Sequence, residues 1–515
     1  MAELNLNADA IEESKLLRLT TDLAVTHDVS EEFSLPDYVP EIRRLLNVRA
    51  QVLPESKYIG DKGADSSLEF GGTVTYLLIY TDDEGELCSL PLTSSYEAET
   101  SLTSHPGLVF IDTTVDNVTS RVNAPRKVTL KSRLKSRIQG WEQTVEEEKI
   151  QGKSTADELF IERKTETLKA VSIKAISLQG IKLSDKLDMM GNQGPRPIWC
   201  DAAITINDAK AQNNTVSVRG ETIIKCICQS NGEMITLTKT VPLAEEIEAE
   251  GATLGDIARV NPRCISLAIS NEENEGVGQL FFDLDCELEG ELIRNTDCVI
   301  TKDCYSTKYE TEESYKTIEV YTALKAQNSS FMINESAKRK SKDIESIIDV
   351  ICDPVYEKTE YKGGKAIVCG KLGVTIIGKS EKGENEKGEY LSEGYEIPFK
   401  YACDLGKSID EGLVKCDLSV GTVNARYEGD KLYVGAQIYT ALSLMEKNTS
   451  KALDTAALKK DREFKKEAGC VRVYFPREGD TLWEIAKKYH TTMNTIKENN
   501  DLTSESMDGV KNLII

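Results

Sequence analysis

The sequence has few of the residues on which catalytic and metal sites depend, and it has no long hydrophobic run. Only three histidines occur in 515 residues, and His27, His105 and His490 stand far apart, outside any metalloprotease or nucleophile motif. No stretch approaches the roughly 20 apolar residues of a membrane span. The N terminus has neither a basic region nor an apolar signal region. We therefore expect a non-enzymatic chain in the cytoplasm, without membrane insertion, and we assign no catalytic residue, cofactor or metal.

Basic residues are in the minority. Lys and Arg number 63 against 86 Asp and Glu, a formal net charge of −23. The region from Val471 onward is nearly neutral, so almost all of the acidity lies upstream of it. This balance argues against a nucleic-acid-binding surface and against electrostatic docking onto anionic lipid.

The thirteen cysteines form no metal-binding pattern. Several lie inside apolar β-like runs, as in residues 224–228, where a thiol behaves as a small hydrophobic group. Cys226 and Cys228 lack a second ligand pair at the spacing that zinc requires. We expect buried, reduced thiols.

One β-rich pattern occurs three times. A glycine stands between two β-forming runs, and the three copies are spaced by 148 and 150 residues: Gly72, Gly220 and Gly370. Such a glycine predicts a bulge or a close backbone approach within a strand. A turn and a returning strand that ends in proline follow each copy, at Pro91, Pro242 and Pro398. Because alternating residues recur farther along each copy, the pattern predicts antiparallel sheets with one buried face.

The fold class is therefore expected to be mainly β, with three tandem antiparallel β-rich repeat domains and a small α+β domain of βααβ order at the C terminus. Charged stretches near residues 142–169 and 311–342 are interpreted as helical or loose spacers. The predicted organisation is an N-terminal segment (1–34), repeat 1 (35–150), repeat 2 with its spacer (151–305), repeat 3 with its spacer (306–446), a helical charged linker (447–469) and the C-terminal domain (470–515).

The C-terminal domain contains clear helix signals. Thr481 and Glu484 have the spacing of a capping box. Leu482, Ile485, Ala486 and Tyr489 follow at the positions of one apolar helix face. Thr492 can cap a second helix, and the apolar residues 513–515 predict a final strand.

The order of these elements and the Gly-Asp-Thr-Leu-Trp core at residues 479–483 resemble a LysM domain, a small module that binds N-acetylglucosamine polymers. In LysM domains, the loops before the first helix and after the second flank a shallow sugar groove. The resemblance implies that the ligand- or partner-binding residues are Gly479, Asp480, Thr481, Leu482, Trp483, Asn500, Asp501, Leu502 and Thr503. The same residues could instead shape the turns and fill the core, and Trp483 is either a partner-facing anchor or part of the core edge.

The opening segment 35–46, the β repeats and a C-terminal LysM domain together resemble the SipL family of clostridial spore-coat morphogenetic proteins. That resemblance implies repeated SPOCS-type domains and a scaffold in the mother-cell cytoplasm, at the forespore surface. Its expected partners are a SpoIVA-like coat-basement ATPase and other coat proteins, with no nucleic acid. The alternative is a LysM-mediated peptidoglycan binder of the cell wall or spore cortex. Because no export signal is visible, we favour the scaffold and expect weak or no binding to peptidoglycan.

Overall fold

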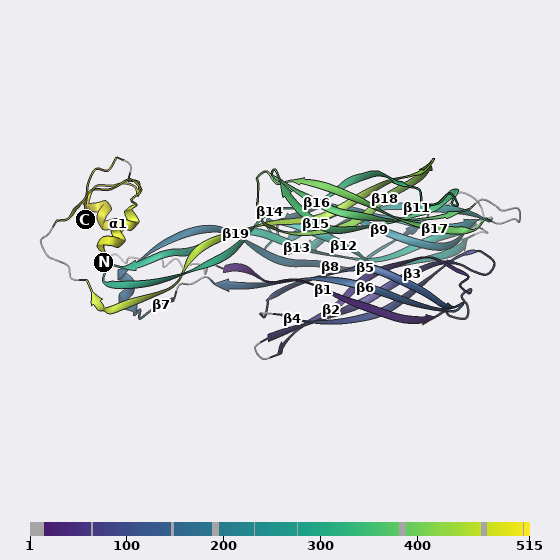
Figure 1. Cartoon of the computed structure of the whole chain (residues 1–515), viewed down its shortest axis with the longest axis horizontal. Helices are drawn as coiled ribbons and strands as arrows, with labels where there is room; N and C mark the ends of the chain where they lie inside the picture. The colour runs from purple at the N-terminus through teal and green to yellow at the C-terminus, as the bar shows by residue number, and fades with distance from the viewer. Residues whose placement is uncertain are drawn as a thin grey trace.

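The chain is mainly β, as expected, with a small helical domain at its C-terminal end (Figure 1). The computed structural model describes residues 15–515 apart from 63–64, 103, 146–148, 188–194, 231, 275–276, 381–387, 465–470 and 508. None of the helices in this described part is long and apolar enough to cross a membrane.

Each repeat is a sandwich of two antiparallel sheets. Among the described residues, each contributes six long strands in the same order. The second, third and fourth strands form one sheet, the meander sheet, with neighbours in chain order. The first, sixth and fifth strands form the other, the long-strand sheet, with the sixth strand in its centre. The alternating apolar residues of both sheets face each other and build a separate core in each repeat.

The strands of repeat 1 are β1 (Lys15–Ser34), β2 (Arg44–Lys62), β3 (Asp65–Thr81), β4 (Leu87–Leu102), β5 (Leu108–Ala124) and β6 (Lys127–Val145). Those of repeat 2 are β8 (Ile161–Lys186), β9 (Arg196–Gln212), β10 (Thr215–Ser230), β11 (Glu233–Glu248), β12 (Ile257–Asn274) and β13 (Val277–Ser306). Those of repeat 3 are β14 (Tyr309–Lys338), β15 (Ser346–Lys362), β16 (Lys365–Lys379), β17 (Tyr390–Asp404), β18 (Gly412–Glu428) and β19 (Lys431–Glu463).

These boundaries correct three expectations. Residues 15–34 are not a separate N-terminal segment, because β1 pairs with β6 along its whole length and completes repeat 1. The spacer expected at 311–342 lies mostly within β14, and the helical linker expected at 447–469 lies within β19 as far as residue 463. In the spacer expected at 142–169, the short strand β7 (Lys149–Gln151) and a 3₁₀ helix (Thr155–Phe160) join β6 to β8. Charged residues dominate these stretches because the strands are solvated on their outer face.

The repeated glycines lie where the backbones of two strands approach closely, as predicted. Each stands on the central strand of a meander sheet, and a Cβ there would lie 2.2, 2.0 or 2.4 Å from a carbonyl oxygen of the neighbouring strand for Gly72, Gly220 and Gly370 respectively. The register of that pairing shifts beside each glycine, which is the mark of a β-bulge. The repeated prolines differ from expectation, since they lie inside β4, β11 and β17 rather than at their ends. These are edge strands, where a missing N–H costs no ladder hydrogen bond.

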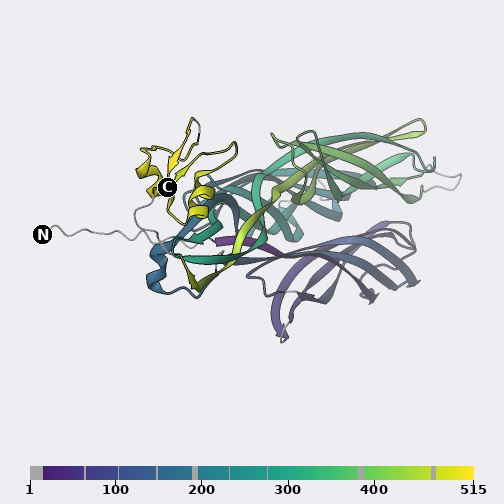
Figure 2. The same ribbon diagram turned by 60° about the vertical axis from the view of Figure 1, so that its left-hand side comes forward.

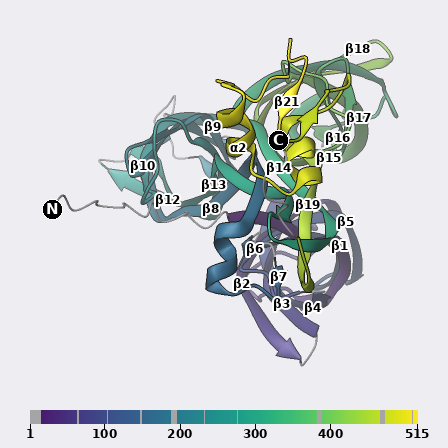
Figure 3. The same ribbon diagram turned by 90° about the vertical axis from the view of Figure 1, so that its left-hand side faces the viewer.

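The three sandwiches surround a common axis, and Figure 3 shows them as three lobes seen along it. Ile79, Ile227 and Ile377 stand seven residues after the three repeated glycines, are fully buried, and belong to one apolar cluster at this axis. Leu46, Ile198 and Ile348 of the second strands join the same cluster. The repeats are therefore packed as a pseudo-threefold trimer within one chain.

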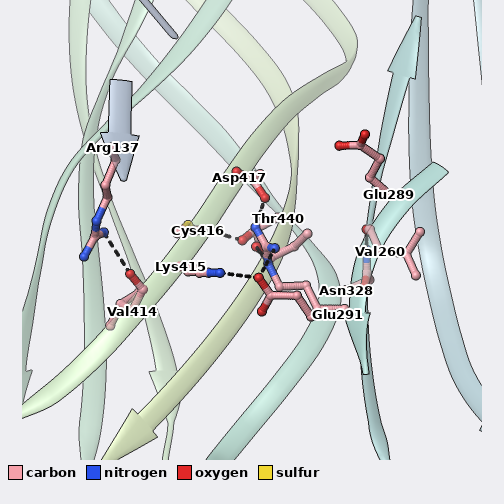
Figure 4. A network of polar contacts seen from close by, with 12 residues as sticks. Arg137, Val260, Glu289, Glu291, Asn328, Val414, Lys415, Cys416, Asp417 and Thr440 are labelled. Carbon is pink, nitrogen blue, oxygen red and sulfur yellow. Dashed lines mark hydrogen bonds and ion pairs between the residues drawn. The ribbon is translucent and has the colours of Figure 1, made fainter. Parts of the chain in front are cut away.

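A buried ionic network also ties the repeats together (Figure 4). Arg259 of β12 pairs with Asp417 of β18, and Lys415 of β18 pairs with Glu291 of β13. Each of repeats 2 and 3 therefore supplies the cation of one ion pair and the carboxylate of the other. Burial lowers the pKa of Lys415 to about 8, although Glu291 opposes this shift. Arg137 donates to the Val414 carbonyl at 3.0 Å, and this hydrogen bond links repeat 1 to the same junction. Breaking one partner of such a buried pair leaves an uncompensated charge, which is costly.

The long strands of repeats 2 and 3 continue beyond the sandwiches as two antiparallel strand pairs, β8 with β13 and β14 with β19, which we call the stem (Figures 1 and 2). The stem consists of residues 161–170, 296–306, 309–320 and 448–463. Its interior holds Cys298, Ile300, Ile318 and Val320, and Leu16 of β1 packs against them. The stem carries the C-terminal domain.

One cysteine expectation is wrong. Cys200 of β9 and Cys226 of β10 face each other across the ladder of repeat 2 and form a disulfide. Cys228 and Cys286 of the same repeat form no disulfide in the described part of the chain and are buried, as expected.

Candidate functional site

The C-terminal domain has the predicted βααβ order. β20 (Val473–Tyr474) pairs antiparallel with β21 (Leu513–Ile514), and α1 (Leu482–Tyr489) and α2 (Met493–Asn499) lie between them in the chain. The helices are too short to be stable alone, so packing on the strand pair must hold them.

Local side-chain hydrogen bonds cap the N termini of both helices, as predicted. The Thr481 hydroxyl accepts from the Glu484 N–H at 3.2 Å, and the Glu484 carboxylate accepts from the Thr481 N–H at 3.3 Å. Thr492 caps α2 by accepting from the Thr495 N–H at 3.0 Å. The core beneath them contains Leu482, Ile485, Ala486, Ile496 and Leu513, all buried.

The first predicted binding loop is anchored to β20. Gly479 is exposed with φ of +94°, in the left-handed region that suits glycine. The Asp480 carboxylate accepts from the Arg477 N–H and from the Tyr474 hydroxyl, both at 2.7 Å. These hydrogen bonds lower the pKa of Asp480. Asp480 therefore shapes the turn, while Gly479 and Thr481 remain at the surface.

The second predicted loop is anchored to β21. The Asn500 side chain donates to the Ile514 carbonyl at 2.8 Å and accepts from the Ile514 N–H at 2.7 Å. Asp501 has φ of 54° and is exposed, Leu502 is half-buried against the core, and Thr503 is exposed. Because β20 and β21 pair, both loops are held by hydrogen bonds to the same two-stranded sheet. The surface residues are Gly479, Thr481, Asp501 and Thr503, whereas Leu482 lies in the core.

Trp483 does not face outward, so its interpretation as a partner-facing anchor does not hold in this structure. Its side chain is only 5% exposed and packs edge-to-face on Tyr305 of the stem, with ring centroids 4.9 Å apart. Its indole N–H donates to Asp303 at 2.8 Å. The domain is thus docked on the stem through the tryptophan.

Asp303 is at the centre of the contact between the C-terminal domain and the stem. Its carboxylate accepts from Trp483, from Lys487 at 2.7 Å and from Tyr315 at 2.8 Å. Lys487 also pairs with Glu313 of β14 at 3.1 Å. Although burial opposes ionisation, these hydrogen bonds hold the pKa of Asp303 below its usual value. Sequence reasoning missed Asp303 because about 180 residues separate it from Trp483 and Lys487, with no local motif to mark it.

Two further contacts join the domain to the stem. The Tyr305 hydroxyl donates to the Thr491 carbonyl at 2.8 Å. The His490 ring, at the C-cap of α1, stacks on Phe464, the residue that follows β19. Several contacts therefore join the C-terminal domain, predicted over residues 470–515, to the β repeats.

An apolar face of the domain remains uncovered. Val471 and Phe475 flank β20 and are 73% and 69% exposed, and Val473 within β20 is 50% exposed. Ile514, opposite Val473 on β21, is 41% exposed. The Val-x-Val-x-Phe alternation of residues 471–475 marks this face in the sequence.

Comparison with known proteins identifies this region. Residues 477–506 match the LysM domain family, so the chain carries a LysM domain, which is a binding module. The match covers both helices and the two loops described above. Neither the curated proteins nor the solved structures give a match to this chain.

Proposed function

We propose that this protein is a non-enzymatic scaffold or adaptor of bacterial spore-coat assembly, which binds a SpoIVA-like coat-basement ATPase through its LysM domain. The observation that carries the proposal is the uncovered apolar sheet face of that domain, residues 471, 473, 475 and 514. Apolar groups gathered on one face favour a protein partner, because burying them removes apolar surface from water. A sugar chain presents hydroxyl groups and gains less from such a face.

The architecture supports a scaffold. Three sandwiches bound by a shared core make a stiff body, and the stem holds the LysM domain at one end of it (Figure 1). From the resemblance to the SipL family we also propose that this scaffold works in the mother-cell cytoplasm, at the forespore surface, with other coat proteins as further partners.

The test is a pull-down of the purified coat ATPase by the full chain. Phe475→Ser with Val473→Thr should reduce binding by about 30-fold or more, because truncating an interface anchor costs about 2 kcal/mol or more. Leu159→Ser is the matched control, because Leu159 is 86% exposed in the 3₁₀ helix and lies outside the LysM domain. Unchanged binding by the first variant, or equal loss in the control, would overturn the proposal.

The alternative function is binding to peptidoglycan, favoured by one observation. The loop residues Gly479, Asp501 and Thr503 stay exposed while the domain is docked, so a glycan could reach them. Sedimentation with purified sacculi distinguishes the two functions: we expect weak or no retention, because a single module lacks the avidity of several. Saturable retention at micromolar protein would favour the wall binder.

A further inference from the structure

The three repeats allow one core position to be compared three times. The eighth residue of the sixth strand is buried in each sandwich, as Leu134, Leu284 and Ile438. The residues paired with these on the first strands are His27, Leu183 and Phe331. Repeat 1 therefore has an imidazole where repeats 2 and 3 have an apolar side chain.

The facing position changes in the same way. The residues opposite the repeated glycines on the fourth strands are Tyr96, Leu243 and Phe399. His27 stacks on Tyr96 with ring centroids 5.3 Å apart, and Phe331 meets Phe399 at 5.6 Å. The same contact is thus His–Tyr in repeat 1 and Phe–Phe in repeat 3, while repeat 2 has leucine at both positions. Beside it, Ser132 replaces the fully buried Phe282 of repeat 2, which removes a large apolar group.

The substituted pair leaves polar atoms without partners. Both ring nitrogens of His27 are buried and have no hydrogen-bond partner in the described part of the chain. The Tyr96 hydroxyl approaches Thr113, whose own hydroxyl is bonded to Ser136 at 2.9 Å, and makes no hydrogen bond of good geometry with the residues that the structure describes. Burial lowers the pKa of His27 against the opposing effect of Asp28, which keeps the imidazole neutral near pH 7. Unpaired buried polar groups cost free energy, so they point to a ligand that completes them.

These groups line a pocket of about 350 Å³ at the open side of sandwich 1, between residues 27–31 of β1 and 94–97 of β4. Both are edge strands, since β1 pairs with β6 and β4 with β3 and neither has a second neighbour among the described strands. Glu31 and Glu97 line the same pocket, are exposed, and make no ion pair within the described residues. We call this pocket, together with the free edges of β1 and β4 beside it, the seam. The seam combines unpaired backbone edges, neutral hydrogen-bond acceptors inside the pocket and carboxylates at its mouth.

We propose that this seam binds an extended segment of a partner protein and receives an arginine or lysine side chain of that segment in the pocket. A β-strand laid along a free edge gains main-chain hydrogen bonds, and the pocket then selects its side chain. The cation would pair with Glu31 and Glu97 and donate to the His27 ring nitrogen and the Tyr96 oxygen. Arginine fits best because its planar guanidinium carries several donors in fixed directions. Repeats 2 and 3 cannot offer this site, because their equivalent pairs are apolar.

The experiment uses the full chain and the histidine signals in its NMR spectrum, which are three in number. The probe is an acetylated and amidated nonapeptide of alternating Thr and Ser with Arg at its centre, and His27→Leu assigns the His27 signal. We expect a saturable shift of that signal with the Arg peptide. The same peptide with citrulline, which keeps the shape and loses the charge, should bind at least about tenfold more weakly.

Two variants test the roles of the residues. Glu31→Gln with Glu97→Gln should weaken binding of the Arg peptide by about tenfold or more without changing Tm. The control variant, Asp83→Asn with Glu84→Gln in the β3–β4 turn, should have no effect on binding. His27→Leu with Tyr96→Leu installs the pair of repeat 2, so it should keep or raise Tm and abolish binding.

Four results would overturn the proposal. These are no response of His27 at millimolar Arg peptide, an equal response to citrulline, binding retained by the leucine pair, and self-association that the leucine pair abolishes. The last would identify a second copy of this chain as the occupant of the seam.

Discussion

Asp303→Asn should release the LysM domain from the stem without unfolding it. The carboxylate accepts hydrogen bonds from Trp483, Lys487 and Tyr315, and its side chain is 19% exposed. A hydrogen bond to a charged group contributes roughly 1.5–3 kcal/mol. Asparagine keeps one acceptor oxygen but loses the charge that faces Lys487. We therefore expect docking to weaken by about 3 kcal/mol, which raises the undocked fraction on the order of 100-fold.

The indole N–H exchange rate of Trp483 measures this change. Undocking exposes that proton, so its exchange should accelerate about 100-fold in Asp303→Asn, by the same conversion of free energy. The indole of Trp199, bonded to Asp349 at 3.2 Å within the body, serves as the internal reference. Asp297→Asn is the matched control, since Asp297 lies on the same strand and pairs with Lys169 at the surface. Unchanged exchange at Trp483, or equal acceleration at Trp199, would refute the reasoning.

Three further outcomes are expected. Gly220→Ala should destabilise the chain by roughly 3 kcal/mol in urea unfolding, because its Cβ would lie 2.0 Å from the Thr205 carbonyl oxygen; a neutral result would contradict the close approach. Ile227→Ala should cost about 2–5 kcal/mol and loosen all three repeats together, as hydrogen exchange can show. Burial raises the pKa of Cys264 and Cys352 to about 12, whereas a thiol in the unfolded chain has a pKa of about 8.5. The contribution of these neutral thiols to the free energy of unfolding should therefore be intact below about pH 8.5 and fall as the pH rises towards 12. Thermal melting over this pH range measures it.

Much of the fold follows from local patterns in the sequence. The spaced glycines and alternating runs predict three β units, because a buried sheet face imposes a period of two. The stem strands were missed because both strand pairs are solvated on their outer face, so lysine and glutamate obscure the alternation of apolar and polar residues. The helix caps at Thr481 and Thr492 were predictable, since each cap lies within three residues of its partner. The contact of Trp483 with the stem was not predictable, because its partner Asp303 is far away in the sequence.

The arrangement of three sandwiches around one apolar axis has a consequence for how the protein can diversify. In a trimer of identical subunits, any substitution appears at three places at once and must be tolerated at all of them. Here the same positions lie on one chain, so each lobe can change alone while the other two maintain the shared core. The LysM domain likewise breaks the threefold equivalence of the repeats, because it contacts the stem at one end of the body only (Figure 1).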